Sequence, residues 1–273
     1  MKTCITVVLS ILLLGLVGCS TVPETGRRQF IIMSADEESQ QGLAAFAEIK
    51  KSEKVSTDAA ANARVKRVGE RIKESVAKSR TMPDAQWEFV VFESDQVNAF
   101  ALPGGKVGVY TGLLKLVSSD DELAIVMGHE IAHVTSRHGA ERASQSTLAS
   151  SISQIGGSAL GYTELSETAK NGIMLAYTGA AQGTMLKYSR DHESEADTIG
   201  MKFAAEAGYN PQAAVTFWKK MAAQSGKGQT TGISALIEKW TSTHPPDAER
   251  IANLEKLAPK YMATYEQAKA RYK

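Results

Sequence analysis

Residues 119–133 read SDDELAIVMGHEIAH, and this stretch predicts both a helix and the chemistry placed on it. Ser119 and Glu122 have the spacing of a capping box, with acidic residues in the first turn, so a helix is expected to begin here. The apolar residues that follow recur with a helical period. His129 and His133 are four residues apart, so both imidazoles lie on one helix face and can reach one metal ion.

Glu130 lies between the two histidines, about 100° around the helix, where its carboxylate can act on a water beside the metal. A catalytic zinc takes three protein ligands, so a third must be found. Gly139 stands where a metzincin-type site would have its third histidine, which excludes that class of site. His138 is on the wrong face for the same metal and is expected to be a surface residue.

A carboxylate from a second helix is the alternative third ligand, and residues 189–197, SRDHESEAD, offer one. Glu193 and Asp197 are four residues apart and share a helix face, whereas Glu195 is expected to face solvent. Glu193 could bind zinc while Asp197 accepts the free ring N–H of a ligating histidine. Spacing alone makes Glu193 a candidate and does not single it out.

Four motifs occur in a fixed order along the chain. NAFALPGG at 98–105 precedes H-E-x-x-H, SRDHESEAD follows about 60 residues after it, and THPP at 243–246 comes last, followed by Arg250. This order resembles the gluzincin metallopeptidases of the HtpX and CAAX-prenyl-protease type over roughly residues 35–257. The chain lacks the transmembrane helices of those members and is most similar to the small bacterial outer-membrane lipoprotein proteases of the family.

The resemblance implies one Zn²⁺ per chain, held by His129, His133 and Glu193, with Glu130 as the catalytic carboxylate and Asp197 behind the ligands. The implied fold is a zincin-like α+β domain, mostly α, with a small β-sheet beside the H-E-x-x-H helix. It also implies a zinc endopeptidase.

The loop with the His-Pro-Pro motif is the remaining candidate part of the site. A peptidase needs a donor for the developing oxyanion, and His244 or Arg250 is the candidate. His244 has two other interpretations: a loop residue without a metal role, or an occupant of the open position on zinc that holds the enzyme inactive until the loop moves.

Residues 98–102 are predicted to form a short strand that ends at the Pro-Gly-Gly turn. The resemblance favours an exposed edge strand whose backbone pairs with an extended substrate. The alternative is an ordinary core strand. The predicted substrate-binding residues are Asn98, Ala99, Phe100 and Ala101.

The N-terminus has the pattern of a lipoprotein signal peptide at residues 1–18, with Lys2 before an apolar stretch that ends in Leu-Val-Gly-Cys. Its likeness to a lipobox implies lipid on Cys19, which would anchor the protein to a membrane. Ser20 follows, and the absence of Asp there favours the outer membrane of a bacterial cell envelope, facing the periplasm. Cys4 is the other cysteine, so no disulfide is expected in the mature chain.

The expected organisation after the signal is a tether at 19–33 and a single metallopeptidase domain at 34–273. Helices are expected at about 34–50, 60–78, 185–207, 211–223 and 246–270, and strands at 87–92 and 106–111. Residues 148–186 are rich in Gly, Ser and Ala and are a candidate lid over the site.

The 31 basic and 30 acidic residues nearly cancel, which argues against a nucleic-acid partner. Two hypotheses remain. The first is a zinc endopeptidase that cleaves unfolded or misassembled envelope polypeptides. The second is a zinc-binding lipoprotein chaperone or scaffold with negligible proteolysis. A glutamate between the two histidines favours chemistry, because a structural zinc site needs no such base. The sequence does not determine the oligomeric state.

Overall fold

The computed structural model describes part of the chain, in two compact units. The described residues are 19–79, 81–145, 147–148, 190–224, 237, 244–245 and 247–272. The expected signal peptide and almost all of the expected lid lie outside them. One unit comprises the chain up to residue 34 with residues 137–192, and the other comprises residues 35–136 with 193–273. The unit boundaries therefore fall inside the stretch expected to be a single domain.

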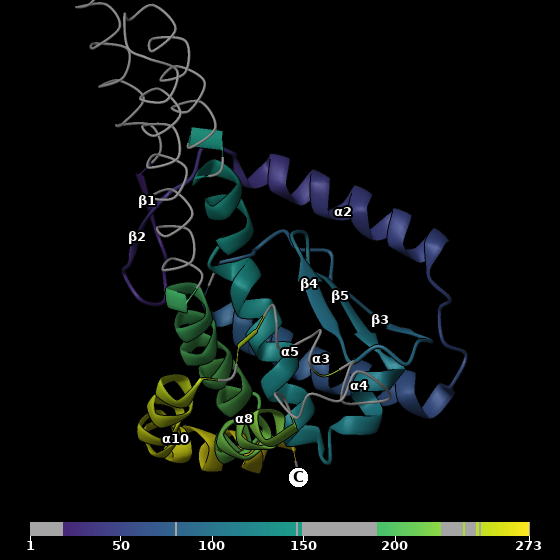
Figure 1. Ribbon diagram of the computed structural model, residues 1–273, viewed down its shortest axis with the longest axis vertical. Coiled ribbons are helices and arrows are strands. Elements are labelled where there is room, and N and C mark those ends of the chain that lie inside the picture. The colour runs from purple at the N-terminus through teal and green to yellow at the C-terminus, as the bar shows by residue number, and fades with distance from the viewer. Residues whose placement is uncertain are drawn as a thin grey trace, which may run out of the picture. The chain divides into compact units, whose positions relative to one another are not determined.

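The first unit contains a small antiparallel sheet, in the stretch that was expected to be a tether (Figure 1). Its strands are β1 (Cys19–Thr21) and β2 (Arg28–Phe30), paired so that Cys19 lies opposite Phe30. Gly26 in the connecting turn has a φ of 73°, which glycine adopts at little cost.

A buried polar cluster in the first unit corrects the prediction that His138 is a surface residue. His138 is 0% exposed, and its ring stacks on that of His192 with centroids 4.3 Å apart. Glu141 accepts hydrogen bonds from His192 Nε2 at 2.9 Å and from Arg27 at 2.7 and 3.0 Å. Burial opposes ionisation of Glu141, but these hydrogen bonds outweigh it and lower its pKa to about 2.

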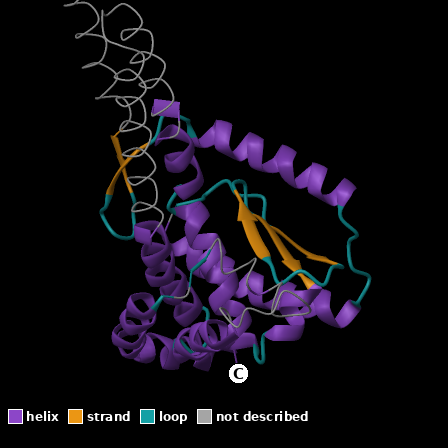
Figure 2. Ribbon diagram, in the orientation of Figure 1, coloured by secondary structure: helices purple, strands orange, loops and turns teal. Residues whose placement is uncertain are grey.

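The second unit contains a three-stranded sheet in the order β3-β5-β4 (Figure 2). β3 (Glu88–Phe92) runs parallel to β5 (Lys106–Tyr110), and β4 (Ala99–Leu102) pairs antiparallel with β5. The predicted turn between β4 and β5 is confirmed, with Gly104 and Gly105 at φ 86° and 83°. β4 is therefore an edge of this sheet, and β5 is buried throughout.

Successive side chains of each strand point to opposite faces of the sheet, and helices cover both faces. Phe46 of α2 packs with Val90, Phe92 and Tyr110 on one face. On the other face, Phe89 lies against Gly69 of α3, and α5 contacts β4. The helices include α2 (Ala35–Ser52), α3 (Ala59–Ser79), α4 (Thr111–Leu116), α5 (Asp120–Thr135), α8 (Gln212–Gln224) and α10 (Ala248–Lys269), followed by a 3₁₀ turn η1 (Ala270–Tyr272).

The predicted α+β fold with mostly helix is confirmed. In α5, the side chain of Ser119 accepts the Glu122 N–H at 3.2 Å, as the capping box predicted. Nearly all of α5 is buried, which is typical of a helix at the centre of a domain. Residues 193–206 are also helical. Within the described part of the chain, no helix is both long and apolar enough to cross a membrane.

Candidate metal centre

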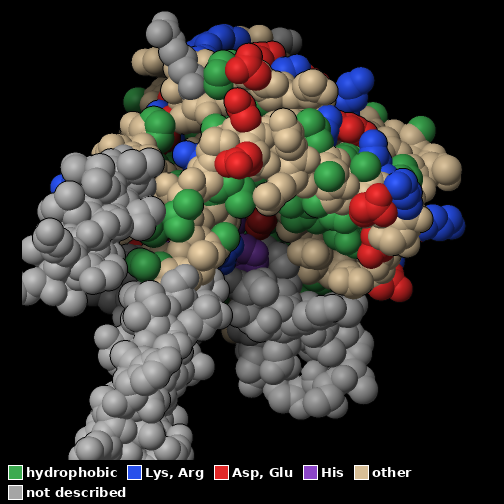
Figure 3. Space-filling view, turned by 90° about the horizontal axis from the view of Figure 1, so that it is seen from above, with side chains coloured by type: hydrophobic (Ala, Val, Ile, Leu, Met, Phe, Trp, Pro, Cys, Tyr) green, Lys and Arg blue, Asp and Glu red, His purple; other side chains and the backbone are tan. Residues whose placement is uncertain are grey.

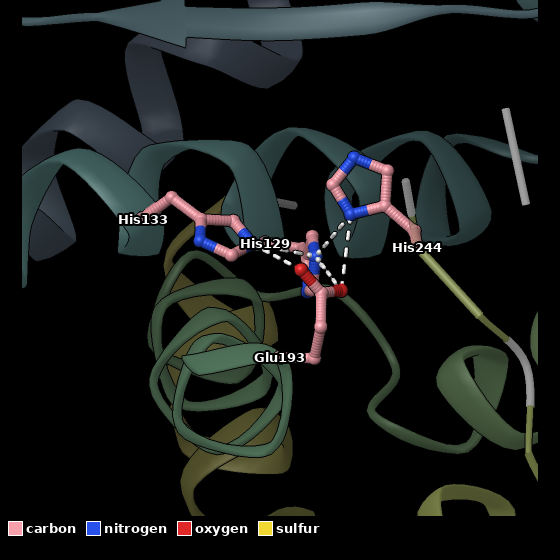
Figure 4. Close-up of side chains that lie close together, drawn as sticks. All are labelled: His129, His133, Glu193 and His244. Carbon is pink, nitrogen blue, oxygen red and sulfur yellow. Dashed lines mark hydrogen bonds and ion pairs between the residues drawn. The ribbon is translucent and has the colours of Figure 1, made fainter. Parts of the chain in front are cut away.

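Two imidazoles on α5 form the base of the site. His129 and His133 are one turn apart, and their Nε2 atoms lie 3.1 Å from each other (Figure 4). His129 is 2% exposed. In the space-filling view, the visible histidine surface is recessed in a hollow rather than raised on the surface (Figure 3). His129 is therefore shielded from bulk water, while His133 and His244 are half-buried.

Glu193 faces both histidines from the second helix. Its Oε1 lies 3.2 Å from His133 Nε2, and its Oε2 lies 3.3 Å from His129 Nε2. His244 comes from a loop later in the chain. Its Nδ1 lies 3.0 Å from Glu193 Oε2 and 3.3 Å from His129 Nε2. One ligand atom from each of these four residues lies within 4.8 Å of all the others.

Two glycines allow the ligand-bearing helices to approach this closely. A Cβ on Gly200 would lie 2.6 Å from the backbone nitrogen of His129, and one on Gly128 would lie 2.7 Å from the Gly200 carbonyl oxygen. Real Cβ atoms do not approach backbone atoms so closely. The two helices therefore touch backbone to backbone beside the first histidine ligand.

The geometry and chemistry of these residues fit zinc. Imidazole nitrogens and a carboxylate are its usual ligands, and four atoms at tetrahedral positions about 2.0–2.1 Å from it would be about 3.3–3.4 Å apart. Neighbouring donor atoms of the four residues lie 3.0–3.3 Å apart, which is close to this spacing.

Glu130 has a buried carboxylate oxygen next to the site that forms no hydrogen bond among the described residues. The residue is 6% exposed, and this oxygen, Oε1, lies 3.6 Å from His244 Nε2. Buried carboxylate oxygens are normally hydrogen-bonded, so this oxygen is suited to a water molecule at the centre. Burial raises the pKa of Glu130.

Electrostatics favour a cation here. Burial opposes protonation of His129, but hydrogen bonds to Asp197 and Glu193 outweigh it and raise its pKa to about 9. Burial likewise opposes ionisation of Glu193, yet the imidazoles around it hold its pKa well below the usual range. The carboxylates of Glu193 and Asp197 thus stabilise positive charge in the site. In the absence of metal this charge is carried by protonated imidazole, and a metal ion can replace those protons.

Asp197 and Arg250 lie behind His129. Asp197 Oδ1 is 3.0 Å from His129 Nδ1, as expected for a carboxylate that orients a ligating imidazole. Arg250 is 3% exposed and forms a two-point contact with Asp197, in which Nη2 lies 2.8 Å from Oδ1 and Nε contacts Oδ2. Arg250 Nη1 lies 3.0 Å from Glu193 Oε2 and also donates to the Pro245 carbonyl at 3.3 Å. These contacts favour a holding role for Arg250 over direct donation to an oxyanion.

The predicted strand at residues 98–102 is confirmed as β4, and it packs against α5. Asn98 precedes it, and its carbonyl accepts the Tyr110 N–H at 3.0 Å. Ala99 is 2% exposed, while Phe100 and Ala101 are half-buried. An edge strand beside the metal helix is in place, and its pairing with a substrate stays a prediction.

Sequence reasoning missed two kinds of residue at this site. The glycine pair and Trp218 contact the ligand residues without belonging to any metal motif. Glu195, which was expected to face solvent, is 8% exposed. The glycines could have been predicted only from the rule that a close helix crossing requires small residues. No local sequence pattern indicated Trp218.

The fold and the site together define a class. A helix with two histidines and a glutamate, completed by a glutamate from a second helix beside a small sheet, is the arrangement of a gluzincin metallopeptidase. Comparison with known families makes this specific: the model of peptidase family M48 matches residues 59–258, well over half of the chain. The chain belongs to that family.

Three relatives illustrate its similarities. Mitochondrial metalloendopeptidase OMA1 of Schizosaccharomyces pombe is 32% identical over 238 residues, covering 87% of this chain and 66% of the relative. The OMA1 of Saccharomyces cerevisiae is 33% identical over 186 residues, covering 67% and 50%. The beta-barrel assembly-enhancing protease of Escherichia coli is 29% identical over 244 residues, covering 88% and 48%. The chain thus spans about half to two thirds of the length of these relatives.

Proposed function

We propose that this protein is a zinc-dependent endopeptidase that hydrolyses peptide bonds in unfolded or misassembled proteins of the cell envelope. The observation on which this rests is the buried Oε1 of Glu130, which has no hydrogen bond among the described residues and lies 3.6 Å from Nε2 of His244, a neighbour of the predicted ligands His129 and Glu193. A purely structural zinc site would need no such carboxylate.

In the proposed mechanism, His129, His133 and Glu193 hold the metal. Zinc, when bound, lowers the pKa of a water molecule to about 7 and polarises the carbonyl of the scissile bond. Glu130 takes a proton from the attacking water as the C–O bond forms, and passes it to the leaving nitrogen as the C–N bond breaks. Asp197 keeps the Nδ1 proton of His129 in place, which would leave Nε2 free to bind the metal.

The proposed substrate class is based on β4, which pairs on only one side, with β5, among the described residues. A peptide segment can add to an exposed strand edge only if its own backbone is extended and free, as in an unfolded chain. Asn98 to Ala101 would pair with it beside the metal helix. The name of the Escherichia coli relative, which refers to β-barrel assembly, supports an envelope substrate.

We place the protein on the outer membrane, facing the periplasm, through lipid on Cys19. The support is the signal pattern that ends at this cysteine. Relatives named as mitochondrial proteins show that the family also occurs elsewhere.

Removal of the metal tests the function directly. Treatment with a strong zinc chelator is expected to abolish casein degradation, and one equivalent of Zn²⁺ per chain is expected to restore it. Circular dichroism before and after treatment checks that the chain is still folded. Degradation that continues in metal-free protein would contradict the proposal.

Replacement of His244 tests what this residue does. Its Nδ1 lies 3.3 Å from His129 Nε2 and 3.0 Å from Glu193 Oε2, so it could take the fourth ligand position of a bound zinc in place of water. If His244 blocks that position in most molecules, His244→Ala is expected to raise casein turnover by roughly tenfold, because the competent fraction increases in proportion. Zinc content, measured in parallel, should stay at one per chain.

The opposite result would give His244 a different role. A fall in turnover of about 10²–10³-fold with zinc retained would identify it as the oxyanion donor. Unchanged turnover with an unchanged metal spectrum would contradict both roles and leave a loop histidine.

A further inference from the structure

Trp218 of α8 contacts two residues of the metal centre although it belongs to no metal motif. It is 2% exposed. The guanidinium carbon of Arg250 lies 3.8 Å from its ring centre, and the ring of His129 meets it edge-on with centroids 5.9 Å apart at 67°. One indole therefore supports both a buried cation and a predicted zinc ligand.

The stacking of Arg250 on Trp218 is important because all the hydrogen-bond donors of Arg250 lie in the plane of its guanidinium group. Those donors are directed at Asp197, Glu193 and a backbone carbonyl. The two faces of the plane have no N–H group to donate, so a polar side chain cannot match them. An aromatic face attracts a buried cation, and tryptophan does so most strongly. A leucine at residue 218 would leave that face against an uncharged, non-aromatic surface.

One route from Arg250 to the ligand His129 passes through a carboxylate oxygen of Asp197. Asp197 Oδ1 accepts from Arg250 Nη2 at 2.8 Å and lies 3.0 Å from His129 Nδ1. A shift of the guanidinium would therefore move the carboxylate that orients the imidazole. Carboxylates in this position set the tautomer and ring orientation of a metal-binding histidine, and their loss typically costs 10–100-fold in metal affinity.

We propose that Trp218 is a positioning residue of the metal centre: its indole holds the guanidinium of Arg250 and the ring of His129 in the orientation that zinc requires. It acts through these two residues and not on the substrate. The proposal rests on zinc binding at this site, which is part of the proposed function, but it does not require that the protein cleaves peptides.

The experiment compares Trp218→Leu, which removes the aromatic face, with Trp218→Phe, which keeps a smaller one. Trp87 supplies the matched controls Trp87→Leu and Trp87→Phe. It stacks on Phe89 at the sheet, with centroids 5.9 Å apart, and has no ring contact with a predicted ligand among the described residues. For each protein, Zn²⁺ affinity is measured by competition with a chelator, and the visible absorption of the Co²⁺ form reports ligand geometry.

Trp218→Leu is expected to weaken Zn²⁺ binding by about 10–100-fold and to change the Co²⁺ spectrum. Trp218→Phe should recover most of the affinity, and both Trp87 variants should match the wild type. If Trp218→Leu does not fold by circular dichroism, Trp218→Met, which fills more of the volume without an aromatic face, takes its place.

Two results would overturn the proposal. One is wild-type affinity and an unchanged Co²⁺ spectrum in a folded Trp218→Leu protein. The other is an equal loss in Trp218→Phe and Trp218→Leu, which would show that only the volume of the indole matters. Because both readouts measure metal binding, absent proteolysis in the wild type would count against the peptidase proposal alone.

Discussion

Glu130→Gln is expected to lower casein degradation by about 10²–10⁴-fold while zinc remains at one per chain. Glutamine preserves the size of the side chain but cannot accept the proton of the attacking water. The metal should stay because the predicted ligands are His129, His133 and Glu193, and Glu130 is not among them. The measurement is zinc content together with the initial rate of degradation at equal protein concentration.

A matched control exists on the same helix. Glu122 is 8% exposed against 6% for Glu130, but its Oε2 accepts hydrogen bonds from the Ser118 N–H at 2.7 Å and from Lys220 at 2.6 Å, outside the site. Glu122→Gln is therefore expected to lower the melting temperature and to leave the rate per folded molecule unchanged. Full cleavage by Glu130→Gln would rule out the mechanism.

Gly200→Ala is expected to distort the metal site and weaken zinc binding. The new methyl group would lie 2.6 Å from the His129 nitrogen and 2.8 Å from the Gly128 carbonyl carbon, both of which are backbone atoms that cannot rotate away. The two helices must separate, which costs about 1–3 kcal/mol in a close-packed interior and moves Glu193 away from the histidines. We expect a lower melting temperature and a loss of zinc affinity of at least tenfold, measured by thermal denaturation and chelator competition.

Gly139→Ala provides the comparison, because a Cβ at this helical position meets nothing within 4 Å. Alanine favours a helix over glycine by about 0.5–1 kcal/mol, so this variant should be as stable as the wild type or slightly more so, with normal zinc binding. Normal zinc affinity in Gly200→Ala would show that the helix contact does not set the ligand geometry.

Local sequence patterns predicted the parts of the site that depend on a single helix. The capping box, the helical period and the spacing of His129 and His133 are all properties of residues 119–133, and the structure shows α5 as expected. The prediction that Glu193 and Asp197 share a helix face likewise depended only on their spacing within one helix. The choice of Glu193 as third ligand needed the resemblance to a family, because spacing within one helix does not say which side faces another.

What the sequence did not predict depends on contacts between distant segments. His138 was assigned to the surface because it lies on the wrong helix face for the same metal, yet it is buried where its ring can stack on His192. The stack of Arg250 on Trp218 joins α10 to α8, and the contact of Gly128 with Gly200 joins α5 to a later helix. No periodicity within one segment contains this information.

The four converging side chains come from three separate stretches of chain: α5, the helix with Glu193, and the loop with His244. A bound ion would therefore act as a crosslink between segments that are 115 residues apart at the extremes. Because the unfolded chain cannot present these groups together, zinc at a hundredfold excess over its dissociation constant would add about 2.7 kcal/mol to the free energy of unfolding. A cell short of zinc would then lose this protein in two ways, through inactive molecules and through molecules that unfold and are themselves degraded.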